Sequence, residues 1–513
     1  MNMKRRDFVK SLTALSIAGS QIPLMAFGRP KHLRTSSGKW NPNRIVIMIK
    51  LNGGNDGLNT LIPVQDQIYY DLRPNLSLRS NDCLPLTYDT KLHPSMKNTK
   101  TFFDQGLASA AHGVGYPSGN LSHFRSSDIW VTGSGSEKIW KTGWLGRMFK
   151  YDYPDYPSSI PEHPIGIQME SSNLLEFQAE DVNMGTIIGN NDSLYNIIKQ
   201  NYFPGTNDPA NDNYGGSELE YIRAIDRSTF EYSDTIQNAG NRGLNKVEYP
   251  NTQIGMQLAV AAKLISGGLK TPVYRLNLGG FDTHANQFSF HADLLQQLDD
   301  AVFAFIKDMS AQKMLQNVLL VTTSEFGRRV KENGSKGTDH GTAAPIFLYG
   351  TSLRGKILGS QPNLSDLDSK GNVKIQYDYR QIYSSIMKDW FELSEITTKE
   401  VLGDDYAPLD LIKEPSLNIS DDIQIPSSFE LSPAYPNPFN PSCLVKYRLP
   451  KGSEVTISIY NLNGKEILRE QLGYKNRGMH QYTVLPNNWA GGTYLINVKA
   501  LGSSKTHKIT YLK

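Results

Sequence analysis

Side chains that bind divalent cations gather in four short polar segments of the sequence. The first three segments directly follow apolar runs at 44–51, 273–278 and 317–323, and the fourth is rich in glycine. Carboxylate, carboxamide and imidazole groups suit zinc, manganese, magnesium or calcium. The candidate metal ligands, in chain order, are Asn55, Asp56, Asp282, His284, Glu325, Asp339 and His340.

Each segment also has an ordinary structural interpretation. Asn-Asp-Gly at 55–57 is turn chemistry, Asp-Thr-His at 282–284 could cap a helix that starts near His291, and Asp-His-Gly at 339–341 could be a loop. The joint placement of three segments after strands is harder to explain in this way, because α/β sheets bind ligands at their strand ends. It favours a metal site, and for His291 we expect packing or capping.

The apolar runs predict strands that are buried on both faces, and 346–350 predicts a fourth. Segments with helical periodicity lie between them, at 254–268, 291–309 and 379–393. Strands that alternate with helices predict an α/β domain over residues 40–413, with a doubly wound, mostly parallel sheet. The strand ends of such a sheet would bring the candidate ligands to one edge.

The composition narrows the possible functions. The chain has 513 residues, so more than one domain is expected, and its net charge of +3 gives no basic field that would attract nucleic acid. The two cysteines, Cys83 and Cys443, are too few for a zinc site built from thiolates, and a disulfide framework is not expected. Any metal must therefore be held by histidine, carboxylate or carboxamide groups.

The first 28 residues have the order of an export signal. Basic residues at 4–6 precede a modest apolar stretch at 12–18, and a small-x-small pattern follows at 26–28. The segment "KRRDFVK" resembles a twin-arginine signal, which implies passage through the twin-arginine translocase. The alternative is an ordinary amphipathic helix. The stretch is too short to span a membrane, and no other apolar run predicts a transmembrane segment.

The last 83 residues predict a small all-β sandwich, residues 431–513, after a polar linker at 414–430. Prolines at 433, 436, 438 and 441 disfavour a helix, and five alternating segments separated by turn residues follow. The strings "YPNPFNP", "ISIYNLNGKEI" and "WAGGTYLINV" resemble the sorting domain of the type IX secretion system. That resemblance implies export through the periplasm to the outside or the outer-membrane surface by that machinery. The alternative is a carbohydrate-binding or adhesive sandwich.

Residues 46–391 resemble a bacterial family, number 1501 among the domains of unknown function. The strings "LNGGNDGLNTLIP", "HGVGYPSGNLSHFRSSDIW", "GGFDTHANQ" and "TSEFGRRVKENGSKGTDHGTAAPIFLYG" carry the resemblance. It implies the alkaline phosphatase-like fold of sulfatases and phosphopentomutases. Enzymes of that superfamily hold two divalent metals around a serine, threonine or formylglycine nucleophile. The resemblance assigns the candidate ligands to the metals and makes Ser122, with His123 beside it, the first choice for the catalytic pair.

The sequence departs from the superfamily pattern at several points. There is no "CxPxR" segment, which makes a formylglycine sulfatase improbable, and Phe326 follows Glu325 where a second histidine is usual. One of the two metal sites is therefore expected to be altered or missing. Arg125, Arg328 and Arg329 could hold an oxyanion, and a solvated turn is the alternative for the last two.

These features favour a secreted or cell-surface metal-dependent hydrolase of phosphate or sulfate esters. A non-catalytic surface protein that keeps the fold and binds glycans or other polymers is the alternative, favoured by the incomplete second metal half. A cell-surface assembly factor is a third hypothesis, which only the two export segments support.

Overall fold

The computed structural model describes most of the chain between residues 40 and 512. The described stretches are 40–117, 119–169, 175–180, 182–188, 232–413, 429–432, 434, 437–475, 478–487 and 489–512. The predicted signal at 1–28 and most of the predicted linker at 414–430 lie outside these residues. In the described stretches, no helix is long and apolar enough to cross a membrane.

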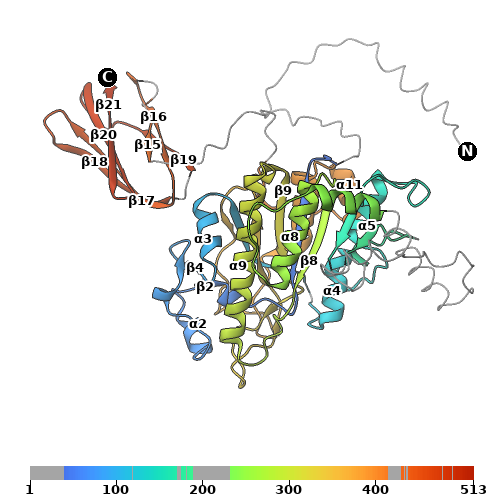
Figure 1. The fold of residues 1–513 in the computed structure, drawn as a ribbon. Helices are drawn as coiled ribbons and strands as arrows, with labels where there is room; N and C mark the ends of the chain where they lie inside the picture. The colour runs from blue at the N-terminus through green and yellow to red at the C-terminus, as the bar shows by residue number, and fades with distance from the viewer. Residues whose placement is uncertain are drawn as a thin grey trace, which may run out of the picture. The chain divides into compact units, whose positions relative to one another are not determined.

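A nine-stranded sheet forms the centre of the larger domain (Figure 1). Its strand order is β13-β5-β12-β9-β1-β8-β6-β7, with β14 beside β5. All neighbours pair in parallel except β12, which is antiparallel to both β5 and β9. The strands are β1 (Ile45–Leu51), β5 (Ala108–Gly115), β6 (Gly166–Gln168), β7 (Gly185–Ile187), β8 (Val273–Leu278), β9 (Val318–Thr323), β12 (Ala344–Tyr349), β13 (Ile357–Leu358) and β14 (Tyr377–Asp378).

Helices cover both faces of this sheet because its central strands are apolar on both sides. In β1, Ile47 and Ile49 contribute to one core cluster, whereas Val46 and Met48 contribute to the other. The first cluster includes residues of α3 (Lys97–Asp104), α8 (Gln253–Ser266) and α9 (Gln287–Ala311). The second includes residues of α4 (His123–Thr132), α5 (Trp144–Asp152), α10 (Tyr379–Ser385) and α11 (Glu395–Leu402). The predicted α/β fold with a mostly parallel, doubly wound sheet is confirmed.

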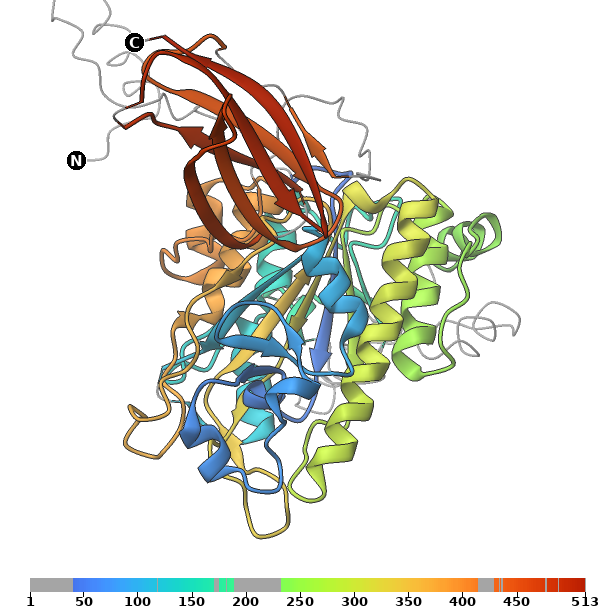
Figure 2. The same cartoon turned by 90° about the vertical axis from the view of Figure 1, so that its left-hand side faces the viewer.

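Short helices and small sheets complete the larger domain. Figure 2 shows α3 (blue) and α9 (yellow) on the same side of the domain. The small elements are α2 (Gln67–Leu72), a sheet of β2 (Leu61–Pro63), β3 (Leu84–Pro85) and β4 (Thr90–Leu92), the pair β10 (Gly327–Arg328) and β11 (His340–Gly341), and the short helices η1 (Gly57–Asn59), η2 (Ser80–Asp82), η3 (Leu175–Phe177), η4 (Leu315–Asn317) and η5 (Ile386–Trp390).

Helix α9 begins earlier than the sequence pattern predicts. Its first residue is Gln287, after Asn286 in a left-handed conformation, and not a residue near His291. His291 therefore lies in the second turn, where it is buried. The predicted packing role of His291 fits this position, and a capping role does not.

The C-terminal residues form two antiparallel sheets that share one core. The first sheet has β15 (Glu430–Leu431), β16 (Cys443–Leu449) and β19 (Gly478–Val484). The second has β17 (Ser453–Asn461), β18 (Glu466–Lys475), β20 (Gly492–Ala500) and β21 (Ser503–Tyr511). Alternate residues such as Val445 in β16 and Ile457 in β17 belong to a single hydrophobic cluster. The predicted all-β sandwich is confirmed.

Candidate metal centre

The candidate ligands that come together are carried by loops and element ends at one edge of the central sheet. Asp282 and His284 lie between β8 and α9, and His340 is the first residue of β11. His123 is the first residue of α4, on the other side of the sheet from α9. These loops pack tightly, since a Cβ atom on Gly53 (φ 121°) would overlap the backbone of Asp282.

One carboxylate oxygen is the point on which the side chains converge. Asp282 Oδ1 lies 3.1 Å from His284 Nε2, 3.2 Å from His340 Nε2 and 3.4 Å from His123 Nε2. It also accepts a hydrogen bond of 2.7 Å from Arg328 Nη2. One ligand atom from each of His123, Asp282 and His340 lies within 4.8 Å of the others, a spacing that a single cation can bridge.

The outer nitrogen of each histidine has a partner that can only accept a hydrogen bond. Nδ1 of His340 lies 2.7 Å from the carbonyl of Leu121, Nδ1 of His123 lies 3.0 Å from Glu325 Oε1, and Nδ1 of His284 lies 3.3 Å from Asp339 Oδ1. When a cation occupies the centre, each Nδ1–H can donate to its acceptor, which leaves the Nε2 atom on the side of Asp282 free to bind the cation. Histidines that bind metals are held in this way by carbonyl and carboxylate groups.

The imidazole nitrogens and the carboxylate oxygen are crowded around one point. His284 Nε2 and His340 Nε2 are only 2.9 Å apart, and both face the Asp282 carboxylate. His123 Nε2 is buried and has no hydrogen-bond partner among the described residues. Three lone pairs and an anionic oxygen repel one another unless protons or a cation lie between them. The residues present therefore fit a bound divalent cation.

The charge states also fit a metal site at neutral pH. Partial burial alone would raise the pKa of Asp282, but hydrogen bonds from Arg328 and His340 outweigh it and lower the pKa to about 2. Burial lowers the pKa of His340 despite its hydrogen bonds to Leu121 and Asp282. Asp282 is thus ionised and His340 is neutral, the forms in which both bind metals.

Arg328 holds the carboxylate of Asp282 in place. Its side chain is buried and donates to the carbonyls of Gly53, Gly54, Phe281 and Thr338 as well as to Asp282. These bonds tie together the loops that follow β1, β8 and β9. Arg328 therefore positions Asp282 and is not the solvated turn residue that was the alternative.

The structure corrects the predicted ligand role of Asn55 and Asp56. Both side chains are buried, and Asp56 forms a bidentate ion pair with Arg73 (2.7 and 3.0 Å) and accepts a hydrogen bond from Gln287. Asn55 Oδ1 lies 3.0 Å from both Thr60 Oγ1 and His291 Nε2. Their oxygens are thus occupied by protein donors, and Asp56 is not in the group formed by His123, Asp282 and His340.

Two further predicted ligands lie behind the histidines. Glu325 is buried and holds His123 Nδ1 and the Gly53 amide (2.8 Å), while Asp339 faces the outer side of His284. Burial makes a carboxylate expensive unless it is paired, and the second oxygen of Glu325 has no partner among the residues described. Both carboxylates therefore lie where they can orient the rings of His123 and His284.

The three predicted catalytic residues do not form one group in the structure. They are Ser122, His123 and Arg125. Ser122 is exposed at the start of α4 and its side chain does not cap the helix. His123 belongs to the candidate metal group with Asp282 and His340, a position that the sequence interpretation missed. Arg125 donates to the carbonyls of Ser136 and Lys138, so its guanidinium is directed to a loop and not to Asp282. Arg329 likewise donates to the Lys370 carbonyl.

Glu325→Gln is expected to weaken metal binding about tenfold or more, because it keeps an oxygen for His123 Nδ1–H but removes the charge that makes the imidazole a better ligand. Competition with a fluorescent chelator measures the dissociation constant of the metal. Glu137→Gln is the matched control, since Glu137 is exposed. Equal affinities of Glu325→Gln and wild type would show that Glu325 does not support the centre.

Comparisons with known proteins match two parts of the chain to protein families. Residues 106–395 match a family described as a protein of unknown function (DUF1501), and residues 433–511 match the secretion system C-terminal sorting domain. No curated protein matches the chain. Similar solved structures include a sulfatase from Pseudoalteromonas sp., PsFucS1, with 11% identity over 72% of this chain and 70% of that chain, at a TM-score of 0.31.

Two other similar structures also come from enzymes. The lipoteichoic acid synthase LtaP from Listeria monocytogenes has 8% identity over 62% of this chain and 66% of that chain, with a TM-score of 0.28. TAB5 alkaline phosphatase has 9% identity over 62% of this chain and 95% of that chain, with a TM-score of 0.27. These scores are too low to transfer a site residue or a reaction. The family match covers more than half of the chain, which therefore belongs to the DUF1501 family and carries a type IX sorting domain at its C-terminus.

Proposed function

We propose that this protein is an exported, metal-dependent hydrolase of phosphate or sulfate esters. The observation that carries the proposal is the convergence of three histidine Nε2 atoms on Asp282 Oδ1. The sorting domain implies export to the cell surface or beyond. The sequence at 1–28 supports passage across the inner membrane through the twin-arginine translocase as part of this proposal.

Zinc or manganese suits these ligands best. Imidazole nitrogens favour zinc and other transition metals, whereas magnesium and calcium prefer sites made of oxygen atoms. When bound, the cation would supply positive charge for the phosphoryl or sulfuryl oxygens and activate a hydroxyl or water. The side chain of Asp282 is 49% exposed and that of His284 is 45% exposed, so the centre is open to a substrate on one side.

The residues around the centre have separate roles in this proposal. Arg328 holds Asp282 in place, and Glu325 and Asp339 orient the rings of His123 and His284. Ser122 remains the proposed nucleophile, because it is exposed and directly precedes His123. Arg125 is not included, since its guanidinium is bound to two loop carbonyls.

A non-catalytic surface protein that binds a polymer is the second candidate. It is favoured by the burial of Asn55 and Asp56, which leaves one candidate metal group in the described part of the chain. Enzymes that stabilise both the attacking and the leaving oxygen often use two metals. Measurements of metal content and of hydrolysis separate the two candidates.

Removal of the metal is expected to abolish ester hydrolysis. The full chain without its signal is loaded with zinc or manganese and assayed on aryl phosphate, bis-aryl phosphate and aryl sulfate esters. Dialysis against EDTA should lower the rate on the accepted ester more than about 100-fold, and the same metal should restore it. His284→Ala should stay inactive after metal is added back.

The outcomes separate the candidates. Stoichiometric metal without hydrolysis of any ester would favour the binding protein over the hydrolase. Absence of bound metal after loading would contradict the metal centre itself. Hydrolysis that survives complete removal of metal would contradict the proposed reaction.

A further inference from the structure

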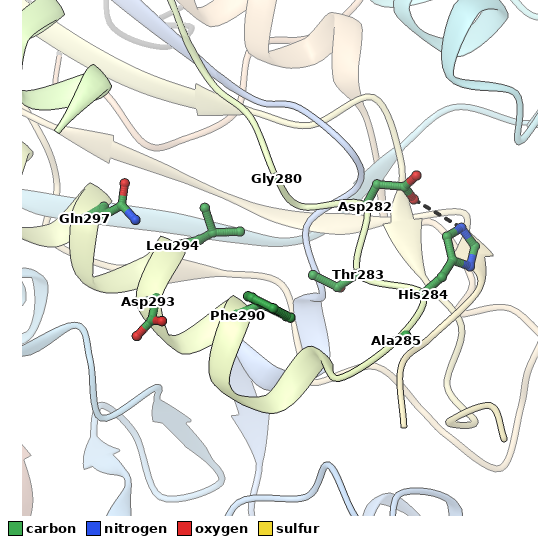
Figure 3. A pocket seen from close by; sticks show the side chains of 9 residues that line it. All are labelled: Gly280, Asp282, Thr283, His284, Ala285, Phe290, Asp293, Leu294 and Gln297. Atoms are coloured by element: carbon green, nitrogen blue, oxygen red, sulfur yellow. Dashed lines mark ion pairs between the residues drawn. The ribbon is translucent and has the colours of Figure 1, made fainter. Parts of the chain in front are cut away.

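A pocket of about 500 Å³ adjoins the candidate metal centre and shares Asp282 and His284 with it (Figure 3). Its size is within the range of small-molecule sites, roughly 300–1,000 Å³. Four further side chains that line the pocket come from the first three turns of α9: Phe290, Asp293, Leu294 and Gln297. A molecule held in this pocket would lie directly beside the metal ligands.

One wall of the pocket is apolar. Phe290 and Leu294 are four residues apart on α9 and therefore lie on the same side of the helix, as Figure 3 shows. The Phe290 residue is 56% exposed, although burial of a phenylalanine side chain is energetically favourable. A flat, apolar face of a ligand that covers this ring would recover part of that energy.

The polar part of the lining is acidic or neutral. Asp293 and Gln297 are also four residues apart, and together with Asp282 they provide carboxylate oxygens and one carboxamide. No lysine or arginine is among the residues that line the pocket. A second anionic group on the substrate would meet two carboxylates without a cation from the protein, whereas hydroxyl groups could donate to Asp293 and bond with Gln297.

We propose that this pocket binds an uncharged, hydroxyl-bearing ring, such as a neutral sugar, that forms the alcohol part of the ester. The apolar face of the ring lies on Phe290 and Leu294, its hydroxyl groups bond to Asp293 and Gln297, and the ester group extends to Asp282 and His284. The identity of the ring as part of a substrate rests on the proposed function. Binding of the ring itself depends only on the pocket.

Saturation-transfer NMR tests the proposal with methyl glycosides of glucose, galactose and N-acetylglucosamine, and with methyl glucuronide as the anionic probe. Phe290→Ala is expected to raise the dissociation constants of the neutral glycosides about tenfold. The matched control is Phe288→Ala. Phe288 is 49% exposed on the same helix and does not line the pocket, so its removal should leave binding unchanged.

The charge of the pocket is tested separately. The glucuronide should bind more weakly than the neutral glycosides, and Asp293→Asn should reduce that difference. Absence of saturation transfer from every neutral glycoside, equal effects of Phe290→Ala and Phe288→Ala in folded protein, or preferred binding of the glucuronide would each overturn the proposal. Circular dichroism checks that all three variants are folded.

The same measurements distinguish failure of the ring-binding proposal from failure of the proposed function. Glycoside binding that persists in protein without ester hydrolysis would sink the proposed function and leave the ring site standing. Hydrolysis of simple aryl esters, with glycoside binding that Phe290→Ala does not change, would do the reverse.

Discussion

Asp282→Asn is expected to remove the divalent cation from the purified protein. Asp282 Oδ1 is the atom on which the Nε2 atoms of His123, His284 and His340 converge. An asparagine keeps an oxygen that can accept the hydrogen bond from Arg328, so the surrounding loops should stay in place. It removes the negative charge, and we expect the metal affinity to fall at least about 100-fold, more than for loss of a group that only supports a ligand.

Elemental analysis after dialysis against metal-free buffer measures this loss. Wild type should keep about one equivalent of zinc or manganese, and Asp282→Asn should keep almost none. The control variant Asp71→Asn makes the same chemical change at an exposed carboxylate on α2 that accepts a hydrogen bond from Gln67. This variant should retain the metal. Full retention by Asp282→Asn would contradict the proposed ligand set.

The strands of the central sheet could be predicted because their local pattern is unambiguous. Runs such as IVIMIKL in β1 are apolar at successive positions, which only a strand covered on both faces can bury. The antiparallel direction of β12 could not be predicted. Its residues are as apolar as those of β9, and its direction depends on the path of the chain between them, through β10 and β11.

The strand-end rule predicted the edge of the sheet but not the depth of each side chain. It placed Asp282 and His284 at one edge, where the structure also brings the side chain of His340. Asp56 also follows a strand, yet its carboxylate is fully buried and paired with Arg73. Arg73 is 17 residues away in a segment without any local motif that shows where its side chain lies.

The role of His123 shows a similar limit. The sequence places it beside Ser122, and the family resemblance suggested a catalytic pair there. The structure makes His123 the first residue of α4. Its partner at Nδ1 is Glu325, 202 residues away. That contact, which identifies Nε2 as the free ligand atom, depends on how β9 and α4 are packed and has no signature in either segment.

Arg73→Met is expected to destabilise the larger domain by about 3–5 kcal/mol, because it leaves the buried Asp56 carboxylate without its counter-charge. Neither side chain is exposed. Burial alone would raise the pKa of Asp56, but the charge and hydrogen bonds of Arg73 keep it below its usual value. Arg73 also donates to the carbonyls of Arg329 and Val330, next to the residue that holds Asp282.

Urea unfolding followed by tryptophan fluorescence measures the loss, and Arg79→Met is the matched control because Arg79 is exposed. The double variant Asp56→Asn/Arg73→Met should recover part of the stability, since it removes the unpaired charge. Recovery should be incomplete, because the two carbonyls still lack their donor.

The lowered pKa of Asp56 also makes the stability from the ion pair depend on pH. The pair contributes fully above the pKa of an unfolded aspartate, about 3.9, and contributes less as the pH falls through the pKa of the folded state. The difference between wild type and Arg73→Met should therefore narrow in acid. A loss below about 1 kcal/mol at neutral pH, or no recovery in the double variant, would show that the ion pair does not hold the loops beneath the metal centre.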